Sequence, residues 1–175
     1  MFLRHGKQVT AVDYGQSVYF EQNRGRIDTI IGDFNEINFD QTYDCLWCSH
    51  VLEHQLNPNR FLTKVHRILR EGGVLAITVP PLKHEIVGGH VTVWNAGLLM
   101  YNLVLAGFDC RLAGILKYGY NISLLVNKTT AHPPADLAFD RGDIRKLRRF
   151  LPSTLAFSHN EVDDPFDGWI TRLNW

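Results

Sequence analysis

A histidine, a glutamate and a second histidine occur at close spacing in the segment His50-Val51-Leu52-Glu53-His54. An imidazole titrates near neutral pH, so His54 is a candidate general base, or a residue that orients a substrate hydroxyl. The spacing H-x-x-E-H is also the inverted zinc-peptidase signature, whose histidines must share one face of a continuous helix. Because Asn57-Pro58 begins a new helix shortly afterwards, the intervening stretch is too short for that site, and we assign no metal ligands. Glu53 and His54 equally suit a structural role in fixing the turn.

Two aspartates, Asp13 and Asp33, each follow a short apolar run that predicts a strand. An ionised carboxylate offers paired acceptors that suit the two hydroxyls of a ribose. Acidic residues also end strands simply because they form turns. Ligands of open α/β sheets bind beyond the carboxyl ends of the strands. We therefore expect both aspartates, the Ser49–His54 turn and the loop Pro80–His90 to lie at that edge of one sheet.

The segment Tyr43–Pro81 has the pattern of a βαβ unit, from which parallel sheets are built. The apolar run Asp44–Cys48 predicts a strand that is buried on both faces of the sheet. Asn57-Pro58 suits the cap and first turn of a helix, and we expect Gly72-Gly73 to end it. Val74–Val79 is the second strand. The apolar face of the helix is predicted to hold Phe61, Leu62, Val65, Ile68 and Leu69.

The remaining segments predict further elements on both sides of this unit. The short connection Tyr118-Gly119-Tyr120 requires its two strands to be antiparallel. One helix is expected to bury the face formed by Trp94, Leu98, Tyr101 and Leu105. The expected strands are Gln8–Val12, Ile27–Gly32, Cys110–Lys117 and Asn121–Asn127, and the expected helices are Ser17–Arg24, Val93–Ala106 and Asp143–Leu151.

The chain has 175 residues, of which 45% are hydrophobic and 21% charged, and its formal net charge is zero. This composition is that of an ordinary globular protein, and the zero charge gives no reason to expect nucleic acid or a membrane as partner. Polar residues and glycines interrupt the longest weakly charged run, 91–108, so we expect no membrane span. The three cysteines and the absence of a visible secretory signal predict a cytoplasmic protein.

Cys45 and Cys48 have a C-x-x-C spacing, and Cys110 stands alone. Residues three apart on a strand point to opposite faces, so the sulfurs of Cys45 and Cys48 are not expected to converge on a metal or on each other. We interpret both as small buried apolar residues.

The order of these motifs resembles that of class I S-adenosylmethionine-dependent methyltransferases. The resemblance rests on VLEH after the strand that Tyr43-Asp44 opens, a helix ending in RxLxxGG, and a strand closing on a proline. It covers about Gly6 to Lys128. It implies a three-layer, Rossmann-like α/β fold with a mostly parallel sheet and an antiparallel C-terminal hairpin. We expect a methyltransferase-like domain at 1–128 and a C-terminal extension at 129–175 that packs on it.

The resemblance also implies roles for individual residues. The cofactor would be S-adenosylmethionine, held at its ribose, adenine and methionine parts by residues from three strand ends. Glu53 and His90 would contact the methyl acceptor, a small molecule or glycan, and His54 would be catalytic. The implied cofactor-binding residues are Asp13 and Tyr14, Asp33 and Phe34, and Ser49 and His50.

One motif of the family is missing upstream of Asp13, namely the glycine-rich loop G-x-G-x-G after the first strand. The chain therefore resembles a family member that is truncated at its N-terminus. In the family, the first strand lies between the strands that end at Asp13 and at Cys48. Its absence would leave two apolar edges unpaired. We expect the two strands to pair directly, or a homodimer to cover the exposed edge.

Two functions remain open at this point. One is an S-adenosylmethionine-dependent methyltransferase acting on a small-molecule or glycan acceptor. The other is a non-catalytic domain, a remnant that keeps the methyltransferase fold without a competent cofactor site.

Overall fold

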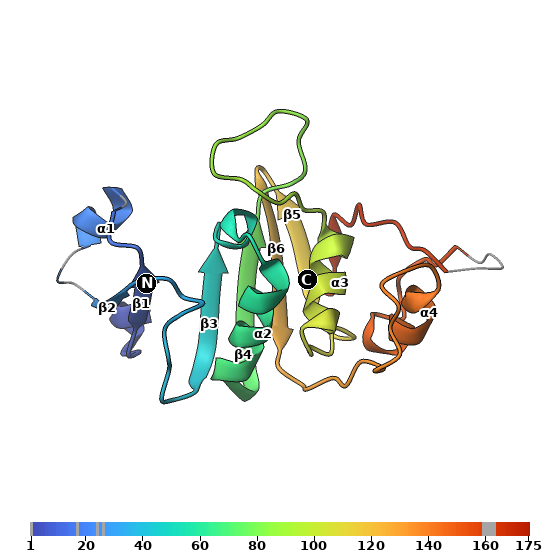
Figure 1. Ribbon diagram of the computed structural model, residues 1–175, viewed down its shortest axis with the longest axis horizontal. Coiled ribbons are helices and arrows are strands. Elements are labelled where there is room, and N and C mark those ends of the chain that lie inside the picture. Colours follow the sequence, from blue (N-terminus) through green and yellow to red (C-terminus); the bar gives the residue numbers. More distant parts are fainter. Residues whose placement is uncertain (1, 17, 24, 26, 159–163) are drawn as a thin grey trace. The chain divides into compact units, whose positions relative to one another are not determined.

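The computed structural model describes residues 2–16, 18–23, 25, 27–158 and 164–175 (Figure 1). The chain divides into two compact units, Met1–Asp40 and Gln41–Trp175. The described strands form one two-stranded sheet, β1-β2, and one five-stranded sheet of order β3-β4-β6-β5-β7. This confirms an α/β fold of the Rossmann-like class, with a mixed sheet.

The first unit is a small β-α-β arrangement. It contains the 3-10 helix η1 (Phe2–His5), β1 (Thr10–Asp13), α1 (Val18–Asn23) and β2 (Asp28–Ile31). The two strands are parallel, with Asp13 opposite Ile31. The predicted strands and helix are thus present, although Ser17 and Arg24 of the predicted helix lie outside the described residues.

The second unit holds the predicted βαβ crossover and hairpin. The crossover consists of β3 (Tyr43–Ser49), the 3-10 helix η2 (Leu52–His54), α2 (Pro58–Ile68) and β4 (Leu69–Val79). Then come α3 (Ala96–Leu105), β5 (Gly114–Tyr118), β6 (Asn121–Asn127), α4 (Asp143–Leu147), η3 (Arg148–Phe150) and β7 (Arg172–Leu173). β3 and β4 are parallel, whereas β6, β5 and β7 each pair antiparallel with their neighbours. The pairing of β7 with β5 was not predicted.

Helix α2 begins as its sequence predicts. The Asn57 side chain accepts a hydrogen bond of 3.0 Å from the Arg60 backbone N–H, and Pro58 occupies the first turn. All five predicted apolar positions are buried, although Leu69 belongs to β4 and not to the helix. The other four lie on α2, which packs with α3 against one face of the sheet (Figure 1). The core of this unit therefore lies between these two helices and β4, β6 and β5. Its large, fully buried side chains include Phe61, Leu62, Leu75, Ile77, Leu99, Leu103 and Leu124.

The prediction that Gly72-Gly73 ends this helix is wrong, because α2 ends at Ile68 and both glycines lie inside β4. The pairing of β3 with β4 shifts register between Tyr43 and Cys45. At this irregularity Gly72 has a φ of +71°, and a Cβ on Gly73 would lie 2.8 Å from Leu69 Cδ1 and 3.0 Å from the Asp44 carbonyl oxygen. The glycines thus serve the strand irregularity and not the helix end.

Strand β3 is not buried on both faces, contrary to the prediction. Trp47 is 65% exposed and Cys45 is also exposed, so the interpretation of Cys45 as buried is wrong too. The reason lies in the position of β3 at the edge of the five-stranded sheet, with α2 and α3 on one face only. Within its own unit, β3 pairs with β4 alone among the described strands.

Helix α3 buries a different face from the predicted one. Leu98 is 42% exposed and Tyr101 and Leu105 are half-buried, while Trp94 is buried just before the helix. Because almost every residue of α3 is apolar, spacing alone does not single out one face. Asn95 caps the helix through a 2.7 Å bond from the Leu98 backbone N–H. The buried residues are Ala96, Gly97, Leu99, Met100, Leu103 and Val104.

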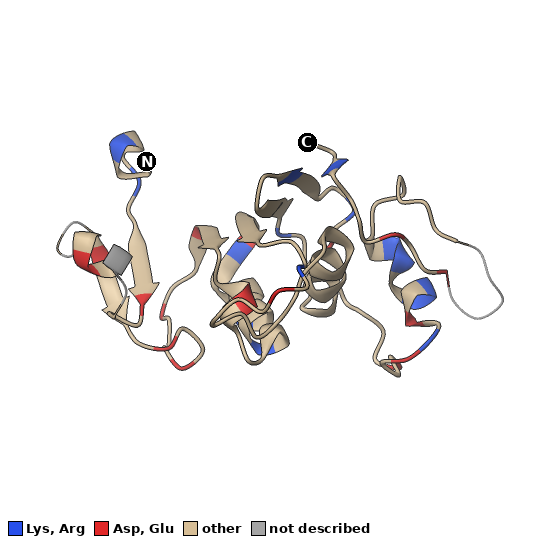
Figure 2. Cartoon of the chain, turned by 90° about the horizontal axis from the view of Figure 1, so that it is seen from above, with Lys and Arg blue, Asp and Glu red and all other residues tan. Residues whose placement is uncertain are grey.

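The predicted basic helix Asp143–Leu151 is shorter than expected, because η3 replaces its last part. Figure 2 shows the basic residues of α4 close to acidic ones. Lys146 Nζ lies 3.0 Å from Asp136 Oδ2, and Arg145 Nε lies 3.4 Å from Asp164 Oδ2. Within the described ranges, no helix combines the length and the apolar character that crossing a membrane requires.

Candidate functional site

The first unit places Asp13 and Asp33 at the carboxyl ends of its two parallel strands. The Gly32 backbone N–H donates to the Asp13 carbonyl oxygen at 3.0 Å, which joins the two strand ends. Asp13 Oδ1 accepts a 2.7 Å bond from the Gly15 N–H, and Asp33 Oδ1 accepts a 2.8 Å bond from the Asn35 N–H. Both aspartates therefore shape turns, and both present carboxylates at the end of the sheet where nucleosides bind in such folds.

Tyr14 contacts Asp33 in this unit. The pKa of the Tyr14 hydroxyl is raised, first by partial desolvation and then by the charge of Asp33 and a hydrogen bond to it. The ring of Phe34 lies 5.5 Å from that of Phe39, measured between centroids. The unit thus gathers Asp13, Tyr14 and Asp33 at one end of β1 and β2, with Phe34 directly after Asp33.

The second unit begins its polar cluster at the end of β3. Ser49 is exposed there, and His50 follows with a φ of +54°, a backbone conformation that is uncommon for residues other than glycine. The His50 N–H donates to the Thr78 carbonyl oxygen at 2.9 Å. This left-handed residue turns the chain out of the sheet and directs the imidazole toward the hairpin, where its ring stacks on Tyr120 at a centroid distance of 6.4 Å.

The His50 ring bridges two side chains from distant parts of the sequence. Its Nδ1 lies 3.1 Å from Glu53 Oε1, and its Nε2 lies 2.8 Å from Asn121 Oδ1. Both partner atoms are acceptors as placed. The imidazolium donates to both atoms. A neutral ring donates to Glu53 from Nδ1 and accepts at Nε2, if the Asn121 amide is turned so that its NH₂ donates to Nε2. Either form keeps a proton on Nδ1 for the Glu53 carboxylate.

Glu53 is the buried centre of the cluster, with a fully buried side chain. Its Oε1 faces His50, whereas its Oε2 is buried without a hydrogen-bond partner among the described residues. The backbone carbonyl of Glu53 accepts bonds of 2.9 Å from Val91 N–H and 3.2 Å from Thr92 N–H. The loop after β4, which projects beyond the carboxyl ends of β3 and β4 (Figure 1), is therefore tied to the turn that carries Glu53.

His54 points into the same loop. Its Nδ1 donates to the Gly89 carbonyl oxygen at 2.7 Å, so in the neutral ring the lone pair is on Nε2, which lies 3.9 Å from Glu53 Oε1. The rings of His54 and His90 meet edge to face, with centroids 5.0 Å apart. Gly89 has a φ of +81°, and a Cβ there would lie 3.2 Å from His54 Nδ1, which explains the glycine. The histidine spacing does not lie on a continuous helix, because η2 spans only Leu52–His54.

Two side chains next to this cluster, Lys83 and Asn121, were not among the predicted site residues. Lys83 Nζ lies 4.3 Å above the ring of Tyr120, and a small cavity of about 50 Å³ next to it is lined by Lys83, His90, Trp94 and Tyr120. Asn121, at the start of β6, holds the His50 ring. A lone lysine in a loop carries no periodic signal, and the contact between residues 50 and 121 depends on the sheet order.

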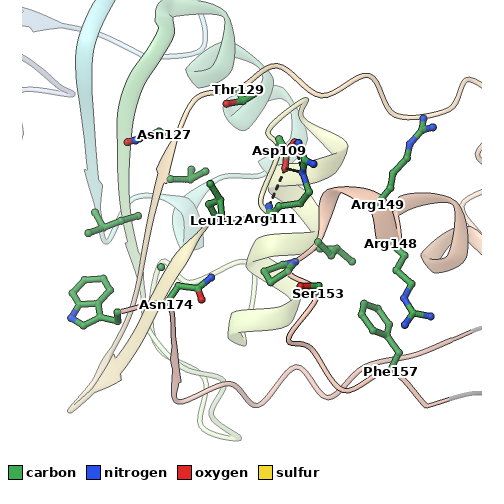
Figure 3. A pocket seen from close by; sticks show the side chains of 16 residues that line it. Asp109, Arg111, Leu112, Asn127, Thr129, Arg148, Arg149, Ser153, Phe157 and Asn174 are labelled. Atoms are coloured by element: carbon green, nitrogen blue, oxygen red, sulfur yellow. Dashed lines mark hydrogen bonds and ion pairs between the residues drawn. The ribbon is translucent and has the colours of Figure 1, made fainter.

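A second, larger pocket of about 1060 Å³ lies elsewhere in this unit (Figure 3). It borders Gly114 and Asn127, which lie toward the amino end of β4, away from the polar cluster. Arg111, which lines it, forms a 2.7 Å ion pair with Asp109. No predicted site residue lines this pocket.

The structure thus distributes the predicted site residues over both units. Asp13, Tyr14, Asp33 and Phe34 belong to the first, and Ser49, His50, Glu53, His54 and His90 belong to the second. Within the second unit, His50, Glu53, His54 and His90 come together, while Ser49 stands exposed at the end of β3.

Comparisons with known proteins agree on the fold. Residues 1–77 match the family model of a methyltransferase domain. No curated protein sequence matches the chain. Among solved structures, the 1,6-didemethyltoxoflavin-N1-methyltransferase of Burkholderia thailandensis, with bound 1,6-didemethyltoxoflavin and S-adenosylhomocysteine, is similar over 73% of this chain at 19% identity, with a TM-score of 0.57.

Two further structures are similar over 73% of the chain. Human N-acetylserotonin methyltransferase, in complex with SAM, has 18% identity and a TM-score of 0.55, and a protein from Pyrococcus horikoshii OT3 has 16% identity and a TM-score of 0.58. The matched regions cover 64% of the Burkholderia protein, 42% of the human protein and 76% of the Pyrococcus protein. These identities establish a shared fold.

Proposed function

Because the chain has the fold of the class I S-adenosylmethionine-dependent methyltransferases, we propose that it binds S-adenosylmethionine and transfers a methyl group to a small-molecule or glycan acceptor. The observation that carries the proposal is the polar cluster His50, Glu53, His54 and His90, which lies beyond the carboxyl ends of two parallel strands in this fold. That is the edge at which open α/β sheets bind their ligands.

The first unit supplies groups that fit a nucleoside. Asp13 and Asp33 end two adjacent parallel strands, and ionised carboxylates accept hydrogen bonds from a ribose diol or from an exocyclic amine. We assign Asp13 to the ribose and Asp33, with the apolar Phe34, to the adenine. Tyr14, already in contact with Asp33, completes this group.

The second unit supplies groups for the reacting end. Ser49 and His50 are assigned to the methionine part of the cofactor, and Glu53 and His90 to the acceptor. When bound, S-adenosylmethionine supplies an activated methyl group, so that positioning provides much of the rate. His54 is the candidate base: Gly89 fixes the proton on Nδ1, and the lone pair on Nε2 is available to take the proton of an acceptor hydroxyl or amine.

The small cavity bordered by Lys83, Trp94 and Tyr120 has a volume of about 50 Å³, so it has room for a small anionic group of an acceptor and not for an aromatic ring. The lysine ammonium favours an anionic group. The Burkholderia enzyme holds 1,6-didemethyltoxoflavin and the human enzyme is named for N-acetylserotonin. Both compounds are small molecules, which agrees with this class of acceptor.

The proposal is tested by calorimetric titration of the full chain with S-adenosylhomocysteine. We expect a single site in the wild-type protein and at least roughly 10-fold weaker binding for Asp13→Ala, because a charge-assisted hydrogen bond contributes about 1.5–3 kcal/mol. Asp28→Ala is the matched control, because Asp28 is an exposed aspartate of β2 in the same unit. Absence of binding to the folded wild-type chain would overturn the proposal in favour of a methyltransferase-fold domain without a competent cofactor site.

A further inference from the structure

We propose that Glu53, His54 and His90 form a binding site for a divalent first-row transition-metal cation. Each residue offers one ligand atom, and these atoms all lie within 4.8 Å of one another. Two ligand atoms that each lie about 2.1 Å from a tetrahedral cation are about 3.4 Å apart, so closure around a cation requires these atoms to approach one another by up to about 1.4 Å. The sequence predicted no metal here, because the histidine spacing lacks a continuous helix and His90 is remote in sequence.

The buried carboxylate of Glu53 provides the first argument. The Glu53 side chain is fully buried, yet among the described residues its Oε2 has no hydrogen-bond partner. A buried carboxylate oxygen without a partner is costly, and such groups usually pair with a cation or coordinate a metal. The other oxygen, Oε1, is oriented by His50 at 3.1 Å, as the carboxylate ligands of metal sites are oriented by outer partners.

The hydrogen bond of His54 provides the second argument. Its Nδ1 donates to the Gly89 carbonyl oxygen, so a neutral His54 ring has its lone pair on Nε2. Nε2 and Glu53 Oε1 lie 3.9 Å apart, which is too far for a hydrogen bond between them. A histidine whose far nitrogen donates to a backbone carbonyl is the usual form of a metal ligand. A cation bound by Nε2 and by the Glu53 carboxylate would use this lone pair and would compensate the charge of the buried carboxylate.

The loop after β4 provides the third argument, because it places His90 at the cluster. The N–H groups of Val91 and Thr92 both donate to the Glu53 carbonyl oxygen. The His90 N–H donates to the Val87 carbonyl oxygen at 3.1 Å. The first two bonds hold the backbone that follows His90 against the turn, and the third closes the loop before it. The half-buried His90 ring then lies edge to face with His54.

The donor set indicates which cation fits. Two imidazole nitrogens and one carboxylate oxygen suit Zn²⁺, Fe²⁺, Co²⁺ or Mn²⁺, whereas Mg²⁺ and Ca²⁺ prefer oxygen ligands alone. Three protein ligands leave at least one position open for a ligand oxygen, where the cation acts as a Lewis acid. With a cation bound, His54 Nε2 is a ligand and no longer a base. Metal binding itself does not depend on cofactor binding.

The test is a calorimetric titration of the untagged, chelator-treated chain with Zn²⁺, repeated with Co²⁺ to follow visible absorption. We expect one ion per chain. His90→Ala and Glu53→Gln are each expected to weaken binding by at least roughly 100-fold, the upper end of the range for outer-shell partners of metal sites. His84→Ala is the matched control, because it removes an exposed histidine of the same loop that does not belong to the cluster.

Circular dichroism establishes that each variant is folded. His90→Ala changes a loop residue outside the core, so it carries the test even if Glu53→Gln destabilises the chain. Two results would overturn the proposal. One is the absence of a stoichiometric site in the wild-type protein. The other is a site whose affinity and Co²⁺ spectrum are the same in wild type, His90→Ala and His84→Ala, because the ion would then bind to other histidines. Binding of S-adenosylhomocysteine, measured separately, has no bearing on either result.

Discussion

His50 Nδ1 and Glu53 Oε1 lie 3.1 Å apart, and this contact joins the end of β3 to the turn that carries His54. Without it, neither oxygen of the fully buried Glu53 carboxylate would have a hydrogen-bond partner among the described residues. His50 is therefore a structural requirement of the cluster as well as a candidate ligand-binding residue.

Replacing His50 by alanine is expected to lower the free energy of unfolding by about 1–3 kcal/mol, the cost of leaving a buried acceptor without a partner. Urea denaturation of the full chain measures this. Asn121→Ala removes only the second His50 contact and leaves Glu53 bonded, so its cost should be smaller. An equal or larger loss for Asn121→Ala would contradict this assignment.

Gly88 and Gly89 offer a matched pair of substitutions in the loop after β4. Gly89→Ala places a Cβ 3.2 Å from His54 Nδ1 at a residue with a φ of +81°, whereas a Cβ on Gly88 meets nothing within 4 Å. We expect Gly89→Ala to lose roughly 1 kcal/mol in unfolding free energy and Gly88→Ala to stay within about 0.5 kcal/mol of wild type. The His54 imidazole resonances should move only for Gly89→Ala. Equal behaviour of the two variants would show that the loop does not hold His54.

The three cysteines should differ in their reaction with a thiol reagent. Cys45 is exposed, although partial desolvation and the charge of Asp44 raise the pKa of its thiol. Burial raises the pKa of the Cys48 thiol to about 12 and also raises that of the buried Cys110 thiol. Because all three pKa values are raised, access to the reagent decides the order of the rates, and one thiol is expected to react faster than the other two in the native chain. Mass spectrometry should locate it at Cys45, and Cys45→Ser should remove the fast phase. Fast labelling of Cys48 would show that the β3 edge opens.

Glu71 should contribute a pH-dependent part of the stability. Hydrogen bonds from the Thr130 side chain and backbone lower the pKa of the Glu71 carboxyl below its ordinary value of 4.5. A lowered pKa in the folded state stabilises the protein above the unfolded-state pKa, and this contribution is lost as the pH falls through the folded-state pKa. The difference in unfolding free energy between wild type and Glu71→Gln should therefore shrink from pH 7 toward acidic pH. A difference that grows on acidification would contradict the assignment.

The parts of the fold that were predictable have local causes. Asn57 and Pro58 define the start of α2 by capping and by a fixed φ, and the apolar spacing of α2 defines its buried face. Apolar spacing did not predict the buried face of α3, because its residues are apolar on all sides. Gly72-Gly73 did not end α2 as predicted, because the role of these glycines depends on the pairing of β4 with β3. The exposure of Trp47 follows from its place on the sheet face that α2 and α3 leave uncovered, which local sequence does not encode.

The candidate site was predictable only in part. The sequence correctly predicted that Asp13, Asp33 and the His50–His54 turn follow strands. The approach of His90 to Glu53 and His54 depends on loop hydrogen bonds from Val91 and Thr92, which have no periodic pattern in the sequence.

The most direct test of the central claim is an NMR titration of the isotope-labelled full chain with S-adenosylhomocysteine. The backbone amides of Gly15 and Asn35, which donate to the carboxylates of Asp13 and Asp33, report on the proposed nucleoside-binding residues. The account predicts that both amide resonances shift together and saturate at one ligand per chain. Unchanged Gly15 and Asn35 resonances at saturating ligand, or shifts confined to residues around Arg111 and Trp175, would contradict it.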